Sequence, residues 1–237
     1  MAKRILAIGG GCALLILVAA ACGGGAAPNA GGAASPPSEA ELIAGLQKLD
    51  YPATLVHGTT LGEAGAPITI LAFEDFTCPH CLEFTATTEQ GIIDTFVKSG
   101  KVKFEFHYYP LRQSSVAPMV AAVCADNQGK FWDYRRRLFI EQAKANAVPA
   151  NRYAATMDAA FGQTALEQYA ADLALDAAKF AACLQSQAPI DTIQADTKLG
   201  DSLGLTGTPW FVVNGKALGS SAPASLDGWK QLIAAVK

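Results

Sequence analysis

The chain has 237 residues, of which 51% are hydrophobic and 16% are charged, and its formal net charge is -3. Because half of the residues are apolar, the chain can bury a sizeable core in one large domain or two small ones. The slightly acidic balance argues against a nucleic-acid partner, since the longest basic run is Arg135-Arg136-Arg137. We interpret that triplet as a solvent-exposed face of a helix.

The first residues have the features of a bacterial export signal. Two basic residues precede an apolar run that is short and glycine-rich for a membrane span, and Cys22 follows three alanines. The pattern resembles a lipoprotein signal, so we expect residues 1–21 to be removed and Cys22 to be lipidated. Ala19 stands where such signals favour leucine; cleavage at an Ala-x-Ala site and an uncleaved anchor are the alternatives. Residues 22–38, rich in glycine, alanine, proline and serine, are predicted to form a flexible tether.

The next segment alternates helix and strand patterns. A lead helix is predicted near residues 39–49, and the apolar run 68–73 predicts a central strand that is covered on both faces. A helix is predicted to begin at Cys78 and to end at Gly100. Residues 102–108 alternate apolar and polar side chains, which predicts a second strand. Strand, helix and parallel strand then form a βαβ unit.

The remainder of the chain is mostly helical in pattern. Residues 114–204 show no comparable strand and are predicted to form several helices, with the aromatic residues of 129–134 in the core. A strand follows at 210–213, and Asn214-Gly215 predicts a tight turn into a short partner strand. A closing helix carries apolar residues on one face over residues 226–236.

The sequence Cys78-Pro79-His80-Cys81 joins the first strand to its helix. Unpaired N–H groups and the positive end of the dipole at a helix N-terminus stabilise a thiolate, and two intervening residues let the second sulfur approach the first. His80 is expected to add a donor beside the Cys78 sulfur. This arrangement predicts a dithiol redox site.

A CxxC motif also occurs in metal and haem sites. A structural zinc site usually needs two such pairs, and c-type haem attachment needs histidine where Leu82 stands. Metal delivery by the cysteine pair with one of the histidines, His57, His80 or His107, stays as an alternative.

Two separate segments carry a family resemblance. Residues 73–81 (FEDFTCPHC) and 206–215 (TGTPWFVVNG) together resemble the DsbA-like thiol:disulfide oxidoreductases, over about residues 52–237. The resemblance implies an α/β protein with a thioredoxin fold and an inserted all-helical subdomain. The fold would then comprise residues 39–113 with the cysteine pair, the insertion 114–204, and residues 205–237 with the proline loop.

The resemblance also implies roles for individual residues. Cys78 would be the exposed, low-pKa sulfur within a Pro79-His80 dipeptide typical of oxidising members, and Cys81 the buried partner that closes the disulfide. Thr208 and Pro209 would line a substrate groove, with a cis peptide bond between them that faces the cysteines. No metal, nucleotide or flavin cofactor is required.

Thioredoxin-type proteins usually place a buried acid six residues before the first cysteine, a position that Ala72 occupies here. Glu74 would share the same strand face, because side chains alternate along a strand. We therefore treat Glu74 as a candidate for proton transfer.

The cysteine count indicates an oxidising compartment. Two of the six cysteines fall in the signal and at the lipidation site, which leaves four. An even remainder suggests two disulfides: the redox pair 78/81 and a structural bond between Cys124 and Cys183. Two separate buried thiols are the alternative for that second pair.

These features favour an exported oxidase that introduces disulfides into proteins with cysteines and is lipid-anchored to the bacterial membrane, in the periplasm or cell envelope. A membrane redox partner would recycle the cysteine pair. Thr208 is familiar in isomerases, whereas oxidases of the family often have valine there, so an envelope reductase or isomerase is the alternative. A metal-binding or assembly-factor-binding lipoprotein is a further one.

Overall fold

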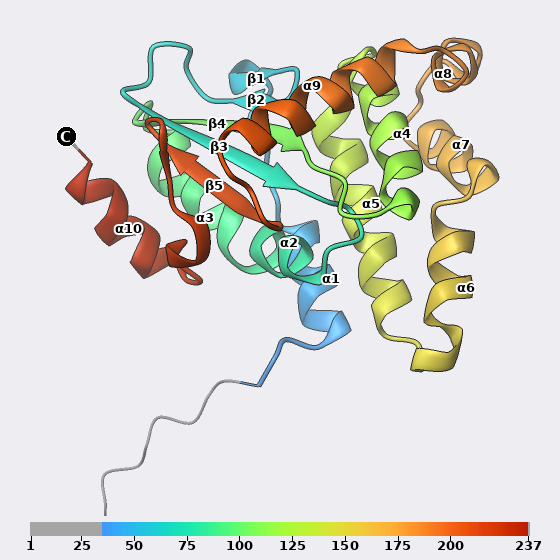
Figure 1. Ribbon diagram of the computed structural model, residues 1–237, viewed down its shortest axis with the longest axis horizontal. Coiled ribbons are helices and arrows are strands. Elements are labelled where there is room, and N and C mark those ends of the chain that lie inside the picture. Colours follow the sequence, from blue (N-terminus) through green and yellow to red (C-terminus); the bar gives the residue numbers. More distant parts are fainter. Residues whose placement is uncertain (1–34, 237) are drawn as a thin grey trace, which may run out of the picture. The chain divides into compact units, whose positions relative to one another are not determined.

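The structure, a computed structural model, describes residues 35–236 (Figure 1). Within them a six-stranded sheet has the order β1-β2-β4-β3-β5-β6. Its strands are β1 (Val56–His57), β2 (Thr60–Leu61), β3 (Ile68–Glu74), β4 (Val102–Tyr108), β5 (Trp210–Val213) and β6 (Lys216–Ala217). Strand β3 pairs with β4 in parallel and with β5 antiparallel. The predicted central strand therefore lies between two others.

The helices flank this sheet and fill the long connection between β4 and β5 (Figure 1). They are α1 (Glu39–Gln47), α2 (Pro79–Phe84), α3 (Gln90–Ile92), α4 (Val116–Asp126), α5 (Phe131–Asn146), α6 (Ala150–Ala160), α7 (Gln163–Asp172), α8 (Ala177–Leu184), α9 (Ala188–Ser202) and α10 (Leu226–Ala235). Short 3₁₀ turns span Ala53–Leu55, Gln113–Ser115 and Gly219–Ser221. Two π-helical turns, Thr85–Glu89 and Ile93–Val97, continue α2 and α3, so the helical run after Cys78 ends shortly before Gly100.

The β3-to-β4 connection through α2 and α3 is the predicted βαβ unit, because β3 and β4 run in parallel. The chain returns to the sheet at β5 and turns sharply into β6. Asn214 and Gly215 both have positive φ, 47° and 79°, as the tight hairpin turn requires. The Asn214 side chain also accepts from the Thr69 backbone N–H at 2.8 Å, which fixes the turn to β3.

Apolar side chains cover both faces of the sheet. The larger cluster includes the aromatic residues Phe84, Phe211 and Trp229, which join α2, β5 and α10. A smaller cluster on the other face contains Phe73 and Val212. The aromatic residues Phe131, Trp132 and Tyr134 are buried, as predicted. Burial on both faces explains why β3 is a nearly continuous apolar run.

Helices α4 to α8 stand together beside the sheet, and α9 leads back toward β5 (Figure 1). This is a thioredoxin fold with a helical insertion, as the family resemblance implied. A disulfide joins Cys124 in α4 to Cys183 in α8, with a Cα–Cα distance of 5.6 Å. The structural bond that cysteine counting suggested is therefore present within the insertion.

The predicted signal, Cys22 and nearly all of the tether lie outside the described residues. Among residues 35–236, no helix has both the length and the apolar character needed to cross a membrane.

Candidate active site

The loop between β3 and α2 places Cys78 at the start of a helix. Cys78 is the N-cap residue of α2, and Pro79 occupies the first turn, where a missing N–H costs no hydrogen bond. The backbone N–H of Cys78 donates to the Asp75 carbonyl oxygen at 3.0 Å. The predicted helix start at the first cysteine is confirmed.

A buried carboxylate holds this loop in place. Asp75 is fully buried and accepts from the backbone N–H groups of Thr77 at 2.7 Å and Leu111 at 2.8 Å. It also accepts from the hydroxyls of Thr77 at 2.9 Å and Ser115 at 2.6 Å. These donors satisfy both carboxylate oxygens, as burial of a charge requires. Asp75 thus ties the residues before Cys78 to the segment that enters α4.

The two cysteines of the motif are both buried and differ in proton affinity. Cys78 is only 4% exposed, so the exposed sulfur that the resemblance implied is wrong; the Thr208 carbonyl oxygen lies 3.2 Å from it. Cys81 is fully buried, and both cysteines are free thiols. A hydrogen bond from Cys81, opposed by burial, lowers the pKa of Cys78 from 9.0 to about 6, with help from Thr208 and from N–H groups at the helix start. Burial, the hydrogen bond to Cys78 and the charge of Glu74 raise the pKa of Cys81. Cys78 is therefore the thiolate at neutral pH, and Cys81 keeps its proton.

The segment before β5 faces the Cys78 sulfur. The Thr208–Pro209 peptide bond is cis, as the resemblance implied. In its protonated form, the Cys78 thiol donates to the Thr208 carbonyl oxygen at 3.2 Å. The Thr208 hydroxyl is buried and has no hydrogen-bond partner in the part of the chain that the structure describes. It is available to donate to Cys78 once the sulfur has lost its proton.

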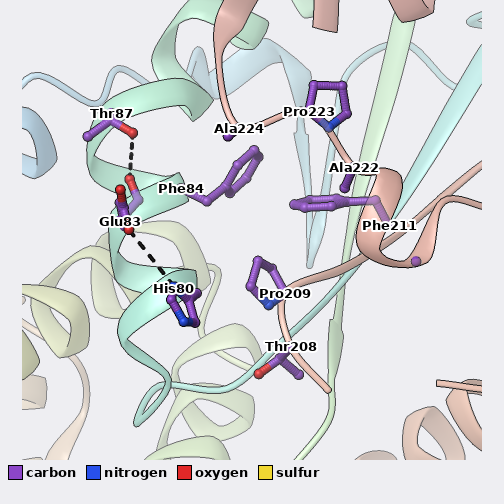
Figure 2. A pocket seen from close by; sticks show the side chains of 11 residues that line it. His80, Glu83, Phe84, Thr87, Thr208, Pro209, Phe211, Ala222, Pro223 and Ala224 are labelled. Atoms are coloured by element: carbon purple, nitrogen blue, oxygen red, sulfur yellow. Dashed lines mark hydrogen bonds and ion pairs between the residues drawn. The ribbon is translucent and has the colours of Figure 1, made fainter. Parts of the chain in front are cut away.

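A groove of about 510 Å³ opens beside Thr208 and Pro209. Its aromatic walls are Phe84 of α2 and Phe211 of β5, whose ring centroids are 4.6 Å apart. Figure 2 shows the Thr208–Pro209 segment across the groove from α2. The other lining residues are His80, Glu83, Thr87, Gly219, Ala222, Pro223 and Ala224. Both residues predicted to line a substrate groove lie in it.

His80 acts on Cys78 through its backbone. Its N–H contributes to the low pKa of Cys78, whereas its side chain is 77% exposed and lies 3.9 Å from the Glu83 carboxylate, measured from Nδ1 to Oε2. The expected donor beside the sulfur is thus a backbone group rather than the ring. The geometry of the first helical turn explains the difference, because N–H groups there point toward the N-cap while side chains point outward.

Arg135 corrects our interpretation of the arginine triplet. Its side chain is fully buried and pairs with Glu74 at 2.8 Å and Glu89 at 2.7 Å. It also donates to the Thr85 hydroxyl at 3.0 Å. The prediction of one exposed face was wrong for Arg135, because consecutive residues on a helix point in different directions. The guanidinium lies near three aromatic rings, those of Phe106, Trp132 and Phe139.

This buried cluster lies close to the second cysteine. Cys81 and Thr85 are four residues apart on one helical run, so they share a side of it, and Arg135 contacts Thr85. Burial raises the pKa of Glu74 to about 7, although Arg135 opposes the shift. The carboxylate that sequence reasoning selected as a proton-transfer candidate therefore has a raised pKa, and its charge in turn helps to raise the pKa of Cys81.

The remaining predicted residues lie apart from this site. His57 is on β1. His107 on β4 is hydrogen-bonded through Nδ1 to Oδ1 of Asp196 on α9, at 2.8 Å. Within residues 35–236, no group of three or more His, Cys, Asp or Glu side chains could hold a metal ion.

Sequence reasoning missed Arg135, Glu89, Asp75 and the aromatic walls of the groove. One signal was available for Arg135: it falls on the apolar stripe of α5 between Phe131 and Leu138, at helical spacing. Nothing comparable marks Asp75, whose donors include a backbone N–H 36 residues away.

A cysteine pair at a helix N-terminus that faces a cis-proline segment, beside a sheet of this strand order, defines a thioredoxin-fold dithiol protein. The family model described as thioredoxin matches residues 54–235. The chain therefore belongs to the thioredoxin family.

Solved structures of DsbA-type proteins share this fold. α-DsbA1 of Wolbachia pipientis matches with a TM-score of 0.61 and 21% identity, covering 80% of this chain and 94% of that one. BdbD of Bacillus subtilis, in its oxidised form, matches with a TM-score of 0.62 and 22% identity, covering 75% of this chain and 91% of that one.

Curated relatives match over shorter stretches. Disulfide bond formation protein D of Bacillus subtilis is 32% identical over 85 residues, which are 35% of this chain and 38% of that protein. The Na(+)/H(+) antiporter NhaA 3 of Salinispora tropica is 26% identical over 158 residues, 65% of this chain. The chain spans 21% of the antiporter's length.

Proposed function

We propose that the protein is a thiol:disulfide oxidoreductase that introduces disulfides into exported proteins through Cys78 and Cys81. The observation that carries the proposal is the asymmetry of the pair. Cys78 has a pKa lowered to about 6 at the edge of a groove, whereas Cys81 is buried with a raised pKa. Stabilising the Cys78 thiolate favours the reduced pair, so the disulfide form is a better oxidant.

The reaction is two successive thiol–disulfide exchanges. In the oxidised protein, a substrate thiolate attacks the Cys78 sulfur; a substrate–Cys78 bond forms, the Cys78–Cys81 bond breaks, and Cys81 leaves with the electron pair and takes up a proton. A second substrate thiolate then attacks the substrate sulfur of this mixed disulfide. Cys78 leaves as a thiolate, the substrate gains a disulfide, and the cysteine pair has accepted two electrons.

Three groups assist these steps in the proposal. The low pKa makes Cys78 a good leaving group in the second exchange. Glu74, with a pKa of about 7, is the candidate that supplies the proton to Cys81. Thr208 and Pro209 present backbone to an extended substrate segment, which would bind as an added strand.

The experiment that tests the direction of electron flow is the reduction potential of the 78/81 pair. The protein is equilibrated with glutathione buffers while the Cys124–Cys183 bond is monitored separately. A value above roughly -180 mV supports an oxidase. A value near or below roughly -270 mV would make the protein an envelope reductase and overturn the proposal.

The location belongs to the same proposal. The likeness of residues 1–22 to a lipoprotein signal supports export and anchoring through a lipid on Cys22. An exported oxidase also needs a membrane partner that reoxidises its cysteine pair. Mass spectrometry of the N-terminal peptide tests the anchor: an acylated Cys22 supports it, and a free N-terminus after Ala-x-Ala cleavage contradicts it.

A further inference from the structure

We propose that Glu83 makes this protein prefer substrate segments that carry a lysine or arginine close to the reactive cysteine. The inference rests on the proposed function and narrows its substrate class. Glu83 was not among the residues that sequence reasoning selected, and it takes no part in the thiol exchange itself.

The position of Glu83 places its charge near the reacting sulfur. Glu83 lies on α2, five residues after Cys78, which corresponds to roughly 7.5 Å along the helix. It lines the groove that extends to Thr208, whose carbonyl oxygen is 3.2 Å from the Cys78 sulfur. An extended segment advances roughly 3.3 Å per residue. A side chain about two residues from the substrate cysteine therefore reaches the carboxylate.

The Glu83 carboxylate is available for a partner. Its side chain is 51% exposed, and its ion-pair contact within the described residues is His80, at 3.9 Å. The hydroxyl of Thr87 donates to the backbone oxygen of Glu83 and leaves the carboxylate free (Figure 2). The other lining residues of the groove include no aspartate, glutamate, lysine or arginine. Glu83 alone therefore gives this groove a fixed charge, and its sign is negative.

The walls of the groove suit the stem of a basic side chain. The partly exposed side chains of Pro209 and Pro223 give the groove an apolar lining, and Phe84 and Phe211 add little to it because they are only 8% and 2% exposed. Lysine and arginine can lay their methylene groups on such a surface while the charged end stays at the polar rim. An uncharged apolar residue would contact only the apolar lining, and an acidic residue would be repelled by the Glu83 carboxylate. The expected order of preference is basic, then apolar, then acidic.

The test compares three reduced two-cysteine peptides that differ only at one position near the first cysteine, which is lysine, methionine or glutamate. The measurement is kcat/KM for their oxidation by the oxidised full chain at low ionic strength. We expect the lysine peptide to exceed the methionine peptide about three- to fivefold, the size of an exposed ion pair, and the preference to fade at high salt. Glu83→Gln should remove the preference, and Glu83→Lys should reverse it.

Glu63→Lys is the matched control. Glu63 is an exposed acid between β2 and β3 and is not part of the groove, so its variant has the same net charge as Glu83→Lys. Equal kcat/KM for the three peptides with the unchanged protein would overturn the inference. So would a reversal by Glu63→Lys as large as that by Glu83→Lys, because the effect would then come from net charge.

A second readout separates the inference from the proposed function. Cys81→Ser removes the resolving thiol, so the initial rate at which Cys78 forms a mixed disulfide with an oxidised peptide can be compared among peptides. A charge preference here that Glu83→Gln removes, without oxidation of reduced peptides, supports Glu83 and counts against the oxidase. Oxidation of all three peptides at one rate supports the oxidase and overturns the role of Glu83.

Discussion

Residues 35–236 contain two cysteine pairs in different surroundings. Cys78 is the N-cap residue of α2, and Cys81 lies within the same helix. Cys124 lies in the last turn of α4 and Cys183 in the last turn of α8, and their bond joins positions 59 residues apart. A helix N-terminus stabilises a thiolate, whereas a helix C-terminus disfavours one.

This difference explains how one fold can hold a reactive disulfide and a structural one. A stable thiolate leaves readily, so a bond that releases Cys78 is easily exchanged. Cys124 and Cys183 lie at helix ends that lack that stabilisation. Exposure does not explain the contrast, because Cys183 is partly buried whereas the reactive Cys78 is only 4% exposed.

The largest expected effect is the loss of activity in Cys78→Ser. Without the attacking and leaving sulfur, neither exchange step can occur, and oxidation of a reduced two-cysteine peptide should fall to the uncatalysed rate. The comparison variant is the double replacement of Cys124 and Cys183 by alanine, which should retain most of the activity. An active Cys78→Ser protein would contradict the mechanism.

The second effect concerns the charges beneath the redox pair. Arg135→Met leaves two buried carboxylates, Glu74 and Glu89, without their partner, so the free energy of unfolding should fall by about 3–5 kcal/mol. Arg137→Met is the control on the same helix, because Arg137 is 32% exposed, and it should cost less than about 1 kcal/mol. Urea unfolding measures both. Equal losses in the free energy of unfolding for the two variants would show that the buried Arg135 cluster contributes no more to stability than the exposed ion pairs of Arg137.

The third effect is on stability through the structural pair. Replacing Cys124 and Cys183 by alanine opens a loop whose ends are 59 residues apart, and the chain-entropy relation gives a loss of about 4 kcal/mol. The potential of the 78/81 pair should stay nearly unchanged, since the low pKa of Cys78 comes from the hydrogen bond of Cys81, from Thr208 and from N–H groups at the start of α2. A clear shift in the reduction potential of the 78/81 pair, alongside the loss in the free energy of unfolding, would mean that the two pairs are coupled.

The sequence predicted best what depends on neighbouring residues. The Cys78 helix start, the β3–β4 unit and the Asn214-Gly215 turn each follow from a local pattern, and each is present. The cis bond before Pro209 could be expected only from the family resemblance, because a trans proline could equally open a strand.

The charges around the pair could not be predicted in the same way. Glu74 and Arg135 are 61 residues apart, and nothing local shows that a guanidinium on α5 will meet the end of β3. A run of three arginines has the composition of a solvated surface. Only the apolar stripe on which Arg135 falls marks it as a buried group. The groove could not be predicted from the sequence either, because Phe84 and Phe211 come from distant segments of the chain.

The smallest expected effect is a change of slope in the potential of the 78/81 pair against pH. Below the Cys78 pKa of about 6, reduction takes up two protons with two electrons, and above it one proton. The slope should therefore change from about 59 to about 30 mV per pH unit near pH 6. The sign follows from linkage: the pKa is lowered from 9.0, so the reduced protein gains stability relative to the oxidised one as pH rises from about 6 to about 9, and loses it as pH falls through 6.

The measurement is the potential of the 78/81 pair in redox buffers from pH 5 to pH 8. The line of potential against pH should become shallower above pH 6, because the Cys78 thiolate then takes up no proton on reduction. A slope that stays at about 59 mV per pH unit over the whole range would mean that Cys78 keeps its proton. The difference between the two cysteine pairs would then not come from a stabilised thiolate at the start of α2.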